Sequence, residues 1–502
     1  MLNEMKIKAL IFGGYFLALL HFSVQAQVST FASLSVHAGE KVPDLICEVS
    51  HAKKPQMKTS EPDDPLVIPD MELVATEKAD ISVVEKLDNA RISSLLMGSL
   101  AENYTGGRPF KIAVWGDSHM AAGFFTRELI KQLGLRLDQV QNTFIPANMN
   151  RAGVRLPVRK TCVSPQWRYE SAHANIEGAQ FPGPALVNLS SADKNASLSW
   201  DLRNSNGTPE LQTVQVLYQQ NLAPVRIAIS VDNQDEVEVV LKGDFGSGVL
   251  ELVGNAPISV LKIRLLEGTF RLHGLLLKWL EPSAKLQLDL FAYPGATVAG
   301  WRSAKIKYFQ SWFPENPYDL VILAYGTNEG NVKPFDPATY QSLLIESIQQ
   351  MKSAFPKASC LLIAPGDRGV LIRKSTLQKF KNKKGAKLKP NTKNKTHNMP
   401  SNSKSLTNTG DASKNKSINL FLYTSIHEKI AAIQKEVGNQ FQCSTWSMLE
   451  AMGGTGSSYA WAKEKPPLMA HDLIHFTPLG YERLAQKFAS DFQWTPAMFP
   501  AE

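Results

Sequence analysis

The sequence predicts an α/β fold, a three-layer sandwich with a mostly parallel sheet that is interrupted by an inserted all-β, jelly-roll-like domain. Strand-like and helix-like runs alternate along much of the chain, which implies parallel strands joined by helices on both faces. Between 151 and 284 the pattern changes to short apolar/polar alternation broken by Asn-Gly, Gly-Asp and Gly-Ser turns, as in β-sandwiches. The expected strands of the α/β part are 110–115, 286–291, 320–324 and 359–364, and its helices are 120–133, 340–355, 418–437 and 477–488.

The ends and the composition of the chain indicate an exported globular protein. With 502 residues, 43% of them hydrophobic and 20% charged, the chain has room for two or three ordinary domains. Lys6 and Lys8 precede an apolar stretch at 9–20, and small residues stand just before Gln27, so residues 1–26 are expected to be a signal peptide. An uncleaved membrane anchor is the alternative. After cleavage we expect no integral membrane segment and a location in the periplasm or cell envelope.

The positive charge of the chain is concentrated in one segment. Residues 371–417 hold thirteen Lys or Arg and one acid, a charge of +12, which leaves −4 of the total +8 for the rest. This segment is poor in apolar residues and has no period, so a disordered loop is expected. It is either a solvated insertion without a role or a cationic arm that draws the protein to an anionic polymer surface.

The four cysteines do not have the spacing of metal ligands. Export would allow one or two disulfides, but the pairing does not follow from the sequence, and buried free thiols are the alternative. The cysteines are Cys47, Cys162, Cys360 and Cys443.

The changes of pattern predict one α/β domain in three parts, separated by two insertions. We expect a signal peptide (1–26), an N-terminal arm and lead-in (27–107), the α/β domain (108–150, 285–370 and 418–502), the β insertion (151–284) and the lysine-rich loop (371–417).

The most informative segment is Val-Trp-Gly-Asp-Ser-His at 114–119, where a strand-like run gives way to a helix-like run. A serine at such a turn, Ser118, can project its hydroxyl beside the first N–H groups of a helix. The hydroxyl is a good nucleophile only when a base takes its proton and an acceptor holds the tautomer of that base. His475 and Asp472 are the candidate base and orienter. Together these residues predict a serine hydrolase.

Two further strand ends carry candidate donors for an oxyanion. Asn328 follows the strand-like run 320–324, and its side-chain amide could reach a developing negative charge. Gly295 follows the run 286–291, and the absence of a side chain would let its N–H approach a substrate closely. Taken alone, each is also an ordinary turn residue.

The order of these motifs resembles that of a known family. Gly-Asp-Ser, Gly-Ala-Thr, Gly-Thr-Asn-Glu and Asp-x-x-His follow one another along the chain. They resemble the motifs of the SGNH (GDSL-type) hydrolases, whose four named residues are Ser, Gly, Asn and His. The resemblance covers 108–150 and 285–495.

The resemblance implies roles for individual residues. It implies a catalytic triad of Ser118, Asp472 and His475. It also implies an oxyanion hole formed by the backbone N–H groups of Ser118 and Gly295 and the side chain of Asn328.

A narrower resemblance rests on the residue after the serine and on the architecture. His119, the β-rich insertion, and the stretch 451–457 followed by Trp461 are similar to the peptidoglycan O-acetylesterases of Gram-negative envelopes. In that group the inserted β domain resembles a carbohydrate-binding module. The long N-terminal arm and the lysine-rich loop depart from that pattern.

Several residues near these motifs have two interpretations. His471 could replace His475 as the base, although the Asp-x-x-His spacing favours His475. Asp117 is expected to bond backbone groups at the turn, beside a possible substrate pocket. His119 either lines that pocket or begins the helix.

Two tryptophans of the insertion also have two interpretations. Trp200 and Trp279 are either sugar-stacking platforms or core residues, and a structural role is expected for His273.

The sequence therefore predicts an exported serine esterase that removes O-acetyl groups, such as that of muramic acid, from cell-wall glycan through an acetyl-enzyme. The expected partner is an acetylated glycan polymer; no metal, cofactor or nucleic acid is expected, and the oligomeric state does not follow from the sequence. The alternatives are a polysaccharide O-acetyltransferase and a glycan-binding protein whose α/β part is inert.

Overall fold

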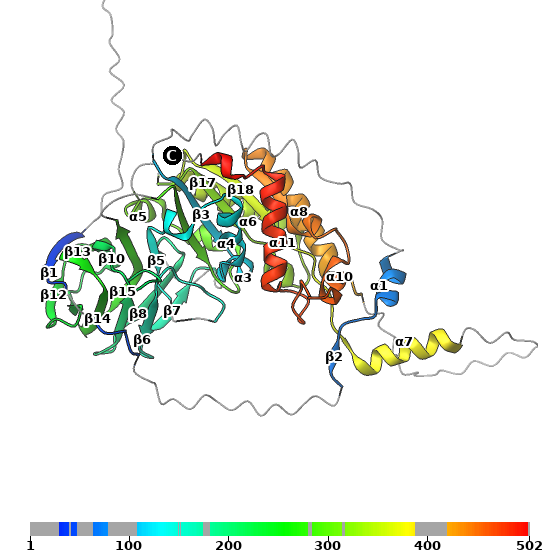
Figure 1. Cartoon of the computed structure of the whole chain (residues 1–502), viewed down its shortest axis with the longest axis horizontal. Helices are drawn as coiled ribbons and strands as arrows, with labels where there is room; N and C mark the ends of the chain where they lie inside the picture. Colours follow the sequence, from blue (N-terminus) through cyan, green and yellow to red (C-terminus); the bar gives the residue numbers. More distant parts are fainter. Residues whose placement is uncertain are drawn as a thin grey trace, which may run out of the picture.

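The protein consists of a β-rich block beside an α/β body, with helix α7 extending away from both (Figure 1). The computed structural model describes residues 30–39, 42–47, 64–78, 108–148, 150, 152–173, 181–279, 284–313, 317–386 and 419–499. The expected signal peptide, 1–26, lies outside the described residues. Among the residues described, no helix is both long and apolar enough to cross a membrane.

The α/β body is built on one parallel sheet of six strands, in the order β20-β18-β17-β3-β16-β4. Every neighbouring pair is parallel, so the predicted parallel sheet is confirmed. The central strands are apolar along nearly their whole length because helices cover both faces. The strands are β3 (Phe110–Gly116), β4 (Val140–Gln141), β16 (Leu286–Ala292), β17 (Leu320–Ala324), β18 (Ser359–Ala364) and β20 (Ser444–Ser447).

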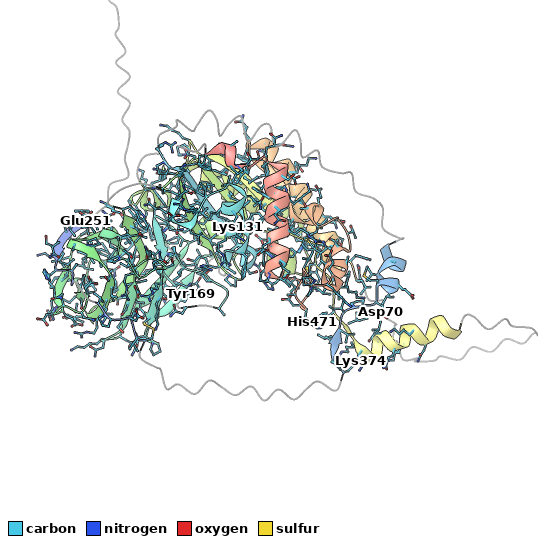
Figure 2. All side chains as sticks on the ribbon, in the orientation of Figure 1. Asp70, Lys131, Tyr169, Glu251, Lys374 and His471 are labelled. Carbon is cyan, nitrogen blue, oxygen red and sulfur yellow. A yellow bond between two sulfur atoms is a disulfide. The ribbon has the colours of Figure 1, made fainter. Side chains whose placement is uncertain are left out.

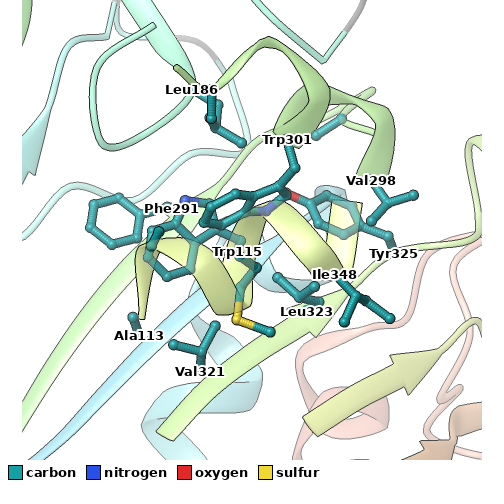
Figure 3. Packing of buried hydrophobic residues seen from close by; sticks show 14 of the residues in the cluster. Ala113, Trp115, Leu186, Phe291, Val298, Trp301, Val321, Leu323, Tyr325 and Ile348 are labelled. Carbon is teal, nitrogen blue, oxygen red and sulfur yellow. The ribbon is translucent and has the colours of Figure 1, made fainter. Parts of the chain in front are cut away.

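Successive residues of β3 point into two separate cores. Ile112 and Val114 belong to one core, while Ala113 and Trp115 belong to the other. Figure 3 shows the second core, in which Trp115 is surrounded by Phe291 and Trp301. The first core is covered by α4 (Phe124–Gln132), α9 (Met448–Ala451), α10 (Ser457–Lys463) and α11 (Pro478–Asp491), and the second by η2 (Val298–Ser303), α5 (Ile306–Gln310), α6 (Pro337–Ala354) and α8 (Leu422–Gln440).

The helix predicted at 120–133 is two helices, α3 (Ser118–Ala121) and α4. The break is at Gly123, which has φ +68° and precedes α4 as its N-cap. A left-handed residue cannot continue an α-helix, and glycine adopts that conformation at little cost. As a result, the helix after Ser118 is only one turn long.

The β-rich block contains two sheets that share one core. One has the order β1-β13-β10-β15-β8-β7 with β5 also on β15, and the other has the order β12-β11-β14-β9-β6. Alternate residues of both, such as Val214 and Val216 of β10 and Ile227 and Ile229 of β11, meet in the shared core. The narrower assignment as a jelly roll stays a prediction. The strands are β6 (Lys160–Val163), β7 (Arg168–Ser171), β8 (Val187–Ser191), β9 (Ser197–Asp201), β10 (Leu211–Gln220), β11 (Val225–Val231), β12 (Val237–Leu241), β13 (Gly246–Ile258), β14 (Val260–Glu267) and β15 (Phe270–Lys278).

Two strands from outside 151–284 belong to this block. β1 (Thr30–Val36) pairs in parallel with β13, and β5 (Phe144–Pro146) pairs with β15. Part of the segment expected to be an arm is therefore a strand. Its apolar residues, Ala32, Leu34 and Val36, alternate along β1 and pack against the shared core, which accounts for the pairing.

The four cysteines form two disulfides, Cys47–Cys162 and Cys360–Cys443. The first joins the N-terminal segment to β6, and the second joins β18 to the residue before β20. The alternative of buried free thiols is therefore wrong.

The expectation of disorder from 371 onward is wrong for its first part. β19 (Ile372–Arg373) pairs with β2 (Leu66–Val67), and α7 (Lys374–Ala386) follows directly. An ion pair of 2.9 Å joins Lys381 to Asp70. Figure 2 labels Lys374 at the base of α7 and Asp70 nearby. The N-terminal segment thus provides partners that composition cannot reveal; residues 387–417 lie outside the described part.

The same N-terminal segment includes a short helix, α1 (Met71–Lys78). Val74 of α1 is buried in a small core together with Ile372, Tyr459 and Leu473. The segment expected to be an arm therefore packs next to the loop that carries Asp472.

Candidate active site

Three neighbouring strands of the parallel sheet end at the same level. Gly116 at the end of β3 is in register with Ala292 of β16 on one side and with Ala324 of β17 on the other. The segments that carry the predicted serine, glycine and asparagine therefore leave one edge of the sheet, where ligand sites of α/β proteins are found.

Ser118 is held at the first residue of α3 by its neighbours in the turn. The buried carboxylate of Asp117 accepts a hydrogen bond of 2.9 Å from the N–H of His119 and caps the helix. The N–H of Asp117 donates to the carbonyl of Ala324, at 3.1 Å, which ties the turn to β17. The expected backbone role of Asp117 agrees with these contacts.

Ser118, His475 and Asp472, which are far apart in the sequence, form a continuous hydrogen-bonded series. Oγ of Ser118 lies 3.0 Å from Nε2 of His475, and Nδ1 of His475 lies 2.7 Å from Oδ2 of Asp472. Because a carboxylate can only accept, Nδ1 carries the proton and Nε2 is free to accept the proton of the serine. His471, the alternative base, is an exposed residue outside this series.

The carboxylate of Asp472 is stabilised by its own loop. Oδ1 accepts hydrogen bonds of 2.9 Å from the N–H groups of Ile474 and His475. Partial burial acts to raise the pKa of Asp472, but the hydrogen bonds from His475 and Ile474 outweigh it, so the pKa is lowered. Asp472 is therefore ionised at neutral pH and can stabilise a protonated His475.

The loop of Asp472 and His475 is fixed at both ends. Leu473 has φ +55° and is fully buried, and its carbonyl accepts a hydrogen bond of 3.1 Å from the N–H of Gly369. Thr477 then caps α11, accepting a hydrogen bond from the N–H of Gly480, and Pro478 occupies the first turn. This cap fixes the start of α11 directly after His475 and Phe476.

The two candidate oxyanion donors lie on loops that are joined to each other. The side-chain amide of Asn328 donates a hydrogen bond of 2.8 Å to the carbonyl of Ala296, the residue after Gly295. Gly295 has φ +82°, and no atom lies within 4 Å of the position that a Cβ would take. The backbone therefore requires glycine or a strained residue, and the space beside it is open.

A buried glutamate connects the same two loops. Glu329 accepts hydrogen bonds from the N–H of Val298 (2.8 Å) and from the N–H of Gly326 (3.0 Å). Nothing in the sequence pattern predicted this role, although Glu329 directly follows Asn328. Burial raises the pKa of Glu329 to about 7, and the nearby charge of Asp117 adds to this effect.

Asp117 is a second buried acid at this edge of the sheet. Burial raises its pKa to about 6, while hydrogen bonds from His119 and Thr327 act in the opposite direction. Two buried carboxyl groups thus lie at this edge of the sheet, and the charge of Asp117 disfavours ionisation of Glu329.

His119 lies beside the histidine of the hydrogen-bonded series. The centre of its ring is 5.6 Å from that of His475 and 5.1 Å from that of Phe476, and Nδ1 lies 3.3 Å from the hydroxyl of Tyr481. Burial lowers its pKa to about 3, so His119 is neutral at physiological pH. His119 is part of the short helix, and its neutral ring packs beside that of His475.

The two tryptophans and the histidine of the β-rich block that the sequence analysis named have defined packing or hydrogen-bond partners. Trp200 is buried in the shared core, and Trp279 packs partly against it, with its indole N–H donating to the carbonyl of Asn142 at 2.9 Å. His273 is fully buried between Asn188 and Tyr308. Trp200 and His273 are therefore structural, and for Trp279 packing against the core accounts for part of its surface.

The similarity of this chain to known proteins lies in its fold. No protein-family model matches the chain, and no curated protein matches it significantly. A solved structure described as "Peptidoglycan O-acetylesterase in action, 5 min" is similar over 81% of this chain and 97% of its own, with a TM-score of 0.54 and 21% sequence identity.

Two carbohydrate esterases of family two also match. The one from Cellvibrio japonicus has 11% identity and a TM-score of 0.21, and covers 67% of this chain and 98% of its own. The one from Corynascus thermopiles, which includes a carbohydrate-binding domain, has 7% identity and a TM-score of 0.22, and covers 65% and 98%. These two TM-scores are too low to indicate that the overall fold is shared. By the first comparison, the chain has the fold of a peptidoglycan O-acetylesterase, the fold that its resemblance to the SGNH hydrolases implied.

Proposed function

We propose that the chain is a serine esterase that removes O-acetyl groups from peptidoglycan through an acetyl-enzyme intermediate. The observation that carries the proposal is the hydrogen-bonded series of Ser118, His475 and Asp472 at the edge of the sheet where the oxyanion donors lie. The fold shared with an enzyme named for this activity supports the choice of substrate.

The series accounts for both halves of the reaction. Oγ of Ser118 attacks the carbonyl carbon of the acetyl group while Nε2 of His475 accepts the hydroxyl proton. The bond between that carbon and the sugar oxygen then breaks, and the oxygen leaves with the proton from Nε2. Water next attacks the acetyl-serine, losing a proton to Nε2, and acetate departs as Oγ of Ser118 recovers a proton.

The oxyanion formed in each half needs donors that are already in place. The N–H groups of Ser118 and Gly295 and the amide of Asn328 are the proposed donors. The hydrogen bond to Ala296 holds one N–H of the amide and so orients the other. Each such donor contributes roughly 10²–10³ in kcat when it faces the developing charge.

The exposure of the site suits a large substrate. The side chain of His475 is 42% exposed and that of Asp472 is 45% exposed, so a polymer can approach without a lid having to open. A site for a small free ester would gain from enclosure, because water weakens its electrostatic interactions.

Export is part of the proposal, since peptidoglycan lies outside the cytoplasm. Its support is the signal-peptide pattern of residues 1–26 together with two disulfides, which persist in oxidising compartments.

The test is an assay of acetate release by the chain without residues 1–26. The substrates are 4-nitrophenyl acetate and O-acetylated peptidoglycan, and the variants are Ser118→Ala and, as a matched control, Ser342→Ala on the exposed side of α6. We expect Ser118→Ala to lower kcat by about 10⁴-fold or more, with the control unchanged.

The assay also separates the alternatives. Release of acetate that does not depend on Ser118, or no release from either substrate, would contradict the esterase proposal. If an added acceptor sugar becomes acetylated at the expense of free acetate, the enzyme is a transferase.

A further inference from the structure

Two cations lie over one aromatic ring, and one of them, Arg368, is near enough to Asp472 to interact with its charge. Cζ of Arg368 is 3.8 Å from the centre of the Tyr423 ring, and Nζ of Lys333 is 4.5 Å from it. Within the described residues, neither cation forms an ion pair with a carboxylate. Two positive charges near one ring repel each other, so their grouping needs a reason.

The backbone of Arg368 is attached to the candidate active site. The next residue, Gly369, donates its N–H to the carbonyl of Leu473, which follows Asp472. The preceding residue, Asp367, is buried and accepts hydrogen bonds from Thr424 (2.6 Å) and from the N–H of Ser458 (2.8 Å). Arg368 is therefore held in place by contacts on both sides.

The guanidinium also contacts the loop that carries the proposed oxyanion donor. Nη1 of Arg368 donates to Oδ1 of Asn331, which lies in η3 (Glu329–Asn331), directly after Asn328. The side chain thus bridges the loops that follow β17 and β18. The positive charge of Arg368 also reaches His119 in the site. Burial and the nearby His475 lower the pKa of His119, and the charge of Arg368 lowers it further.

Part of the hydrogen-bonding capacity of this guanidinium is unused. Nε of Arg368 is buried and has no hydrogen-bond partner in the described part of the chain, and the only hydrogen bond of its terminal nitrogens is that to Asn331. A cation that is stacked on a ring, partly buried and short of acceptors is suited to an anionic group. Planar guanidinium groups favour carboxylates in particular.

We propose that Arg368, assisted by Lys333, binds a carboxylate of the substrate next to the acetyl ester, so that the enzyme selects acidic glycans or glycopeptides. This inference rests on the proposed function, because it assumes that the ester reacts at Ser118. Arg368 would be a specificity-determining residue, since it acts on the substrate and not on the reacting bond.

The experiment compares an acidic substrate with its neutral counterpart. O-acetylated peptidoglycan fragments with free carboxylates are assayed beside the same fragments after their carboxylates are converted to amides. The quantity measured is the ratio of kcat/KM for the acidic fragments to that for the amidated ones. We expect Arg368→Gln to reduce this ratio by about 10- to 100-fold, which corresponds to the loss of a hydrogen-bonded charge pair.

Three variants complete the set. Arg368→Lys keeps the charge but loses the planar geometry, and we expect it to recover part of the ratio. Lys333→Gln is expected to reduce the ratio by less than Arg368→Gln. Arg226→Gln, at an exposed position of β11 in the β-rich block, removes one positive charge elsewhere and is the matched control, for which the ratio stays unchanged.

A binding measurement keeps this inference separate from the proposed function. The same fragments are titrated calorimetrically into Ser118→Ala, with and without Arg368→Gln. If acidic fragments bind more tightly than amidated ones only when Arg368 is present, the carboxylate site at Arg368 is confirmed, whether or not the wild type releases acetate.

Other outcomes overturn the inference. If Arg368→Gln lowers kcat/KM equally for acidic and amidated fragments, Arg368 is a positioning residue for Asp472 and not a carboxylate site. If acetate is released at Ser118 while the ratio and the binding are unchanged in Arg368→Gln, the proposed function stands and the carboxylate site is wrong.

Discussion

Glu329 is a residue whose buried environment disfavours its own charge. It is buried, and its carboxyl group connects the two loops that hold the proposed oxyanion donors. Burial raises its pKa from 4.5 to about 7. The geometry of the donors therefore depends on a group that changes its charge near neutral pH.

The first prediction concerns this change of charge. A carboxyl group with a raised pKa binds its proton more tightly in the folded state, so stability is highest below 4.5 and declines as the pH rises toward 7. Glu329→Gln resembles the protonated form and removes this decline. From pH 4.5 to 7.5, the free energy of unfolding of the wild type should fall by about 2–3 kcal/mol relative to that of the variant.

Chemical denaturation at several pH values measures this difference. Asp244→Asn, which changes an exposed acid of the β-rich block, is the control. It keeps Glu329, so its free energy of unfolding should fall with pH in parallel with that of the wild type. A parallel pH dependence in the wild type and in Glu329→Gln would contradict the raised pKa.

At the scale of elements, the turn that follows β16 carries Gly295, one of the proposed oxyanion donors. Gly295 has a left-handed backbone, and the space that its Cβ would occupy is empty. Both features suit a backbone N–H that faces a bound carbonyl oxygen. An ordinary turn glycine would share the φ value, but it would not need the open space.

The second prediction separates these two interpretations. In Gly295→Ala, the left-handed conformation costs about 1 kcal/mol of stability, and the added methyl group enters the open space. We expect kcat/KM for acetylated glycan to fall by about 10²-fold, well beyond what the loss of stability explains. Gly207→Ala, at φ +83° in the β-rich block, is the control with the same backbone cost.

If Gly295→Ala and Gly207→Ala lose the same stability and both keep full activity, Gly295 is only a turn residue. Kinetic assays beside thermal melting distinguish the outcomes.

Most elements of the α/β body could be predicted because their signals are local. The predicted strand at 320–324 matches β17, and the predicted strand at 359–364 matches β18. Periodicity did not reveal the break at Gly123 or the four-residue strand β20, since neither changes the apolar pattern much. Likewise, β1 looked like part of an arm because its partner, β13, lies more than 200 residues later.

At the scale of the whole molecule, each disulfide belongs to a different part. Cys360–Cys443 closes a loop with a sequence separation of 83 and joins β18 to the residue before β20, in the sheet that carries the site. Cys47–Cys162 has a separation of 115 and joins the N-terminal segment to the β-rich block.

The third prediction follows from this division. Replacing both Cys360 and Cys443 by alanine should destabilise the α/β body by about 2–4 kcal/mol, so that activity is lost at a lower denaturant concentration. The matched pair Cys47→Ala and Cys162→Ala should leave the midpoint of activity loss nearly unchanged, because that bond lies outside the body. Residual activity after incubation in guanidinium measures both, and equal shifts would contradict the division.

Local patterns were enough to predict the α/β class and the block of alternating strands, because hydrophobic period and turn residues act over short stretches of chain. The residue types and their order were enough to predict serine-hydrolase chemistry. The two disulfide pairs, the strand contributed by residues 30–36, the link through Glu329 and the placement of Arg368 near Asp472 became known only from the folded structure. It also placed His475, and not His471, 3.0 Å from Ser118. Such contacts join segments far apart in the chain, and their choice depends on how buried surfaces pack, which no local pattern records.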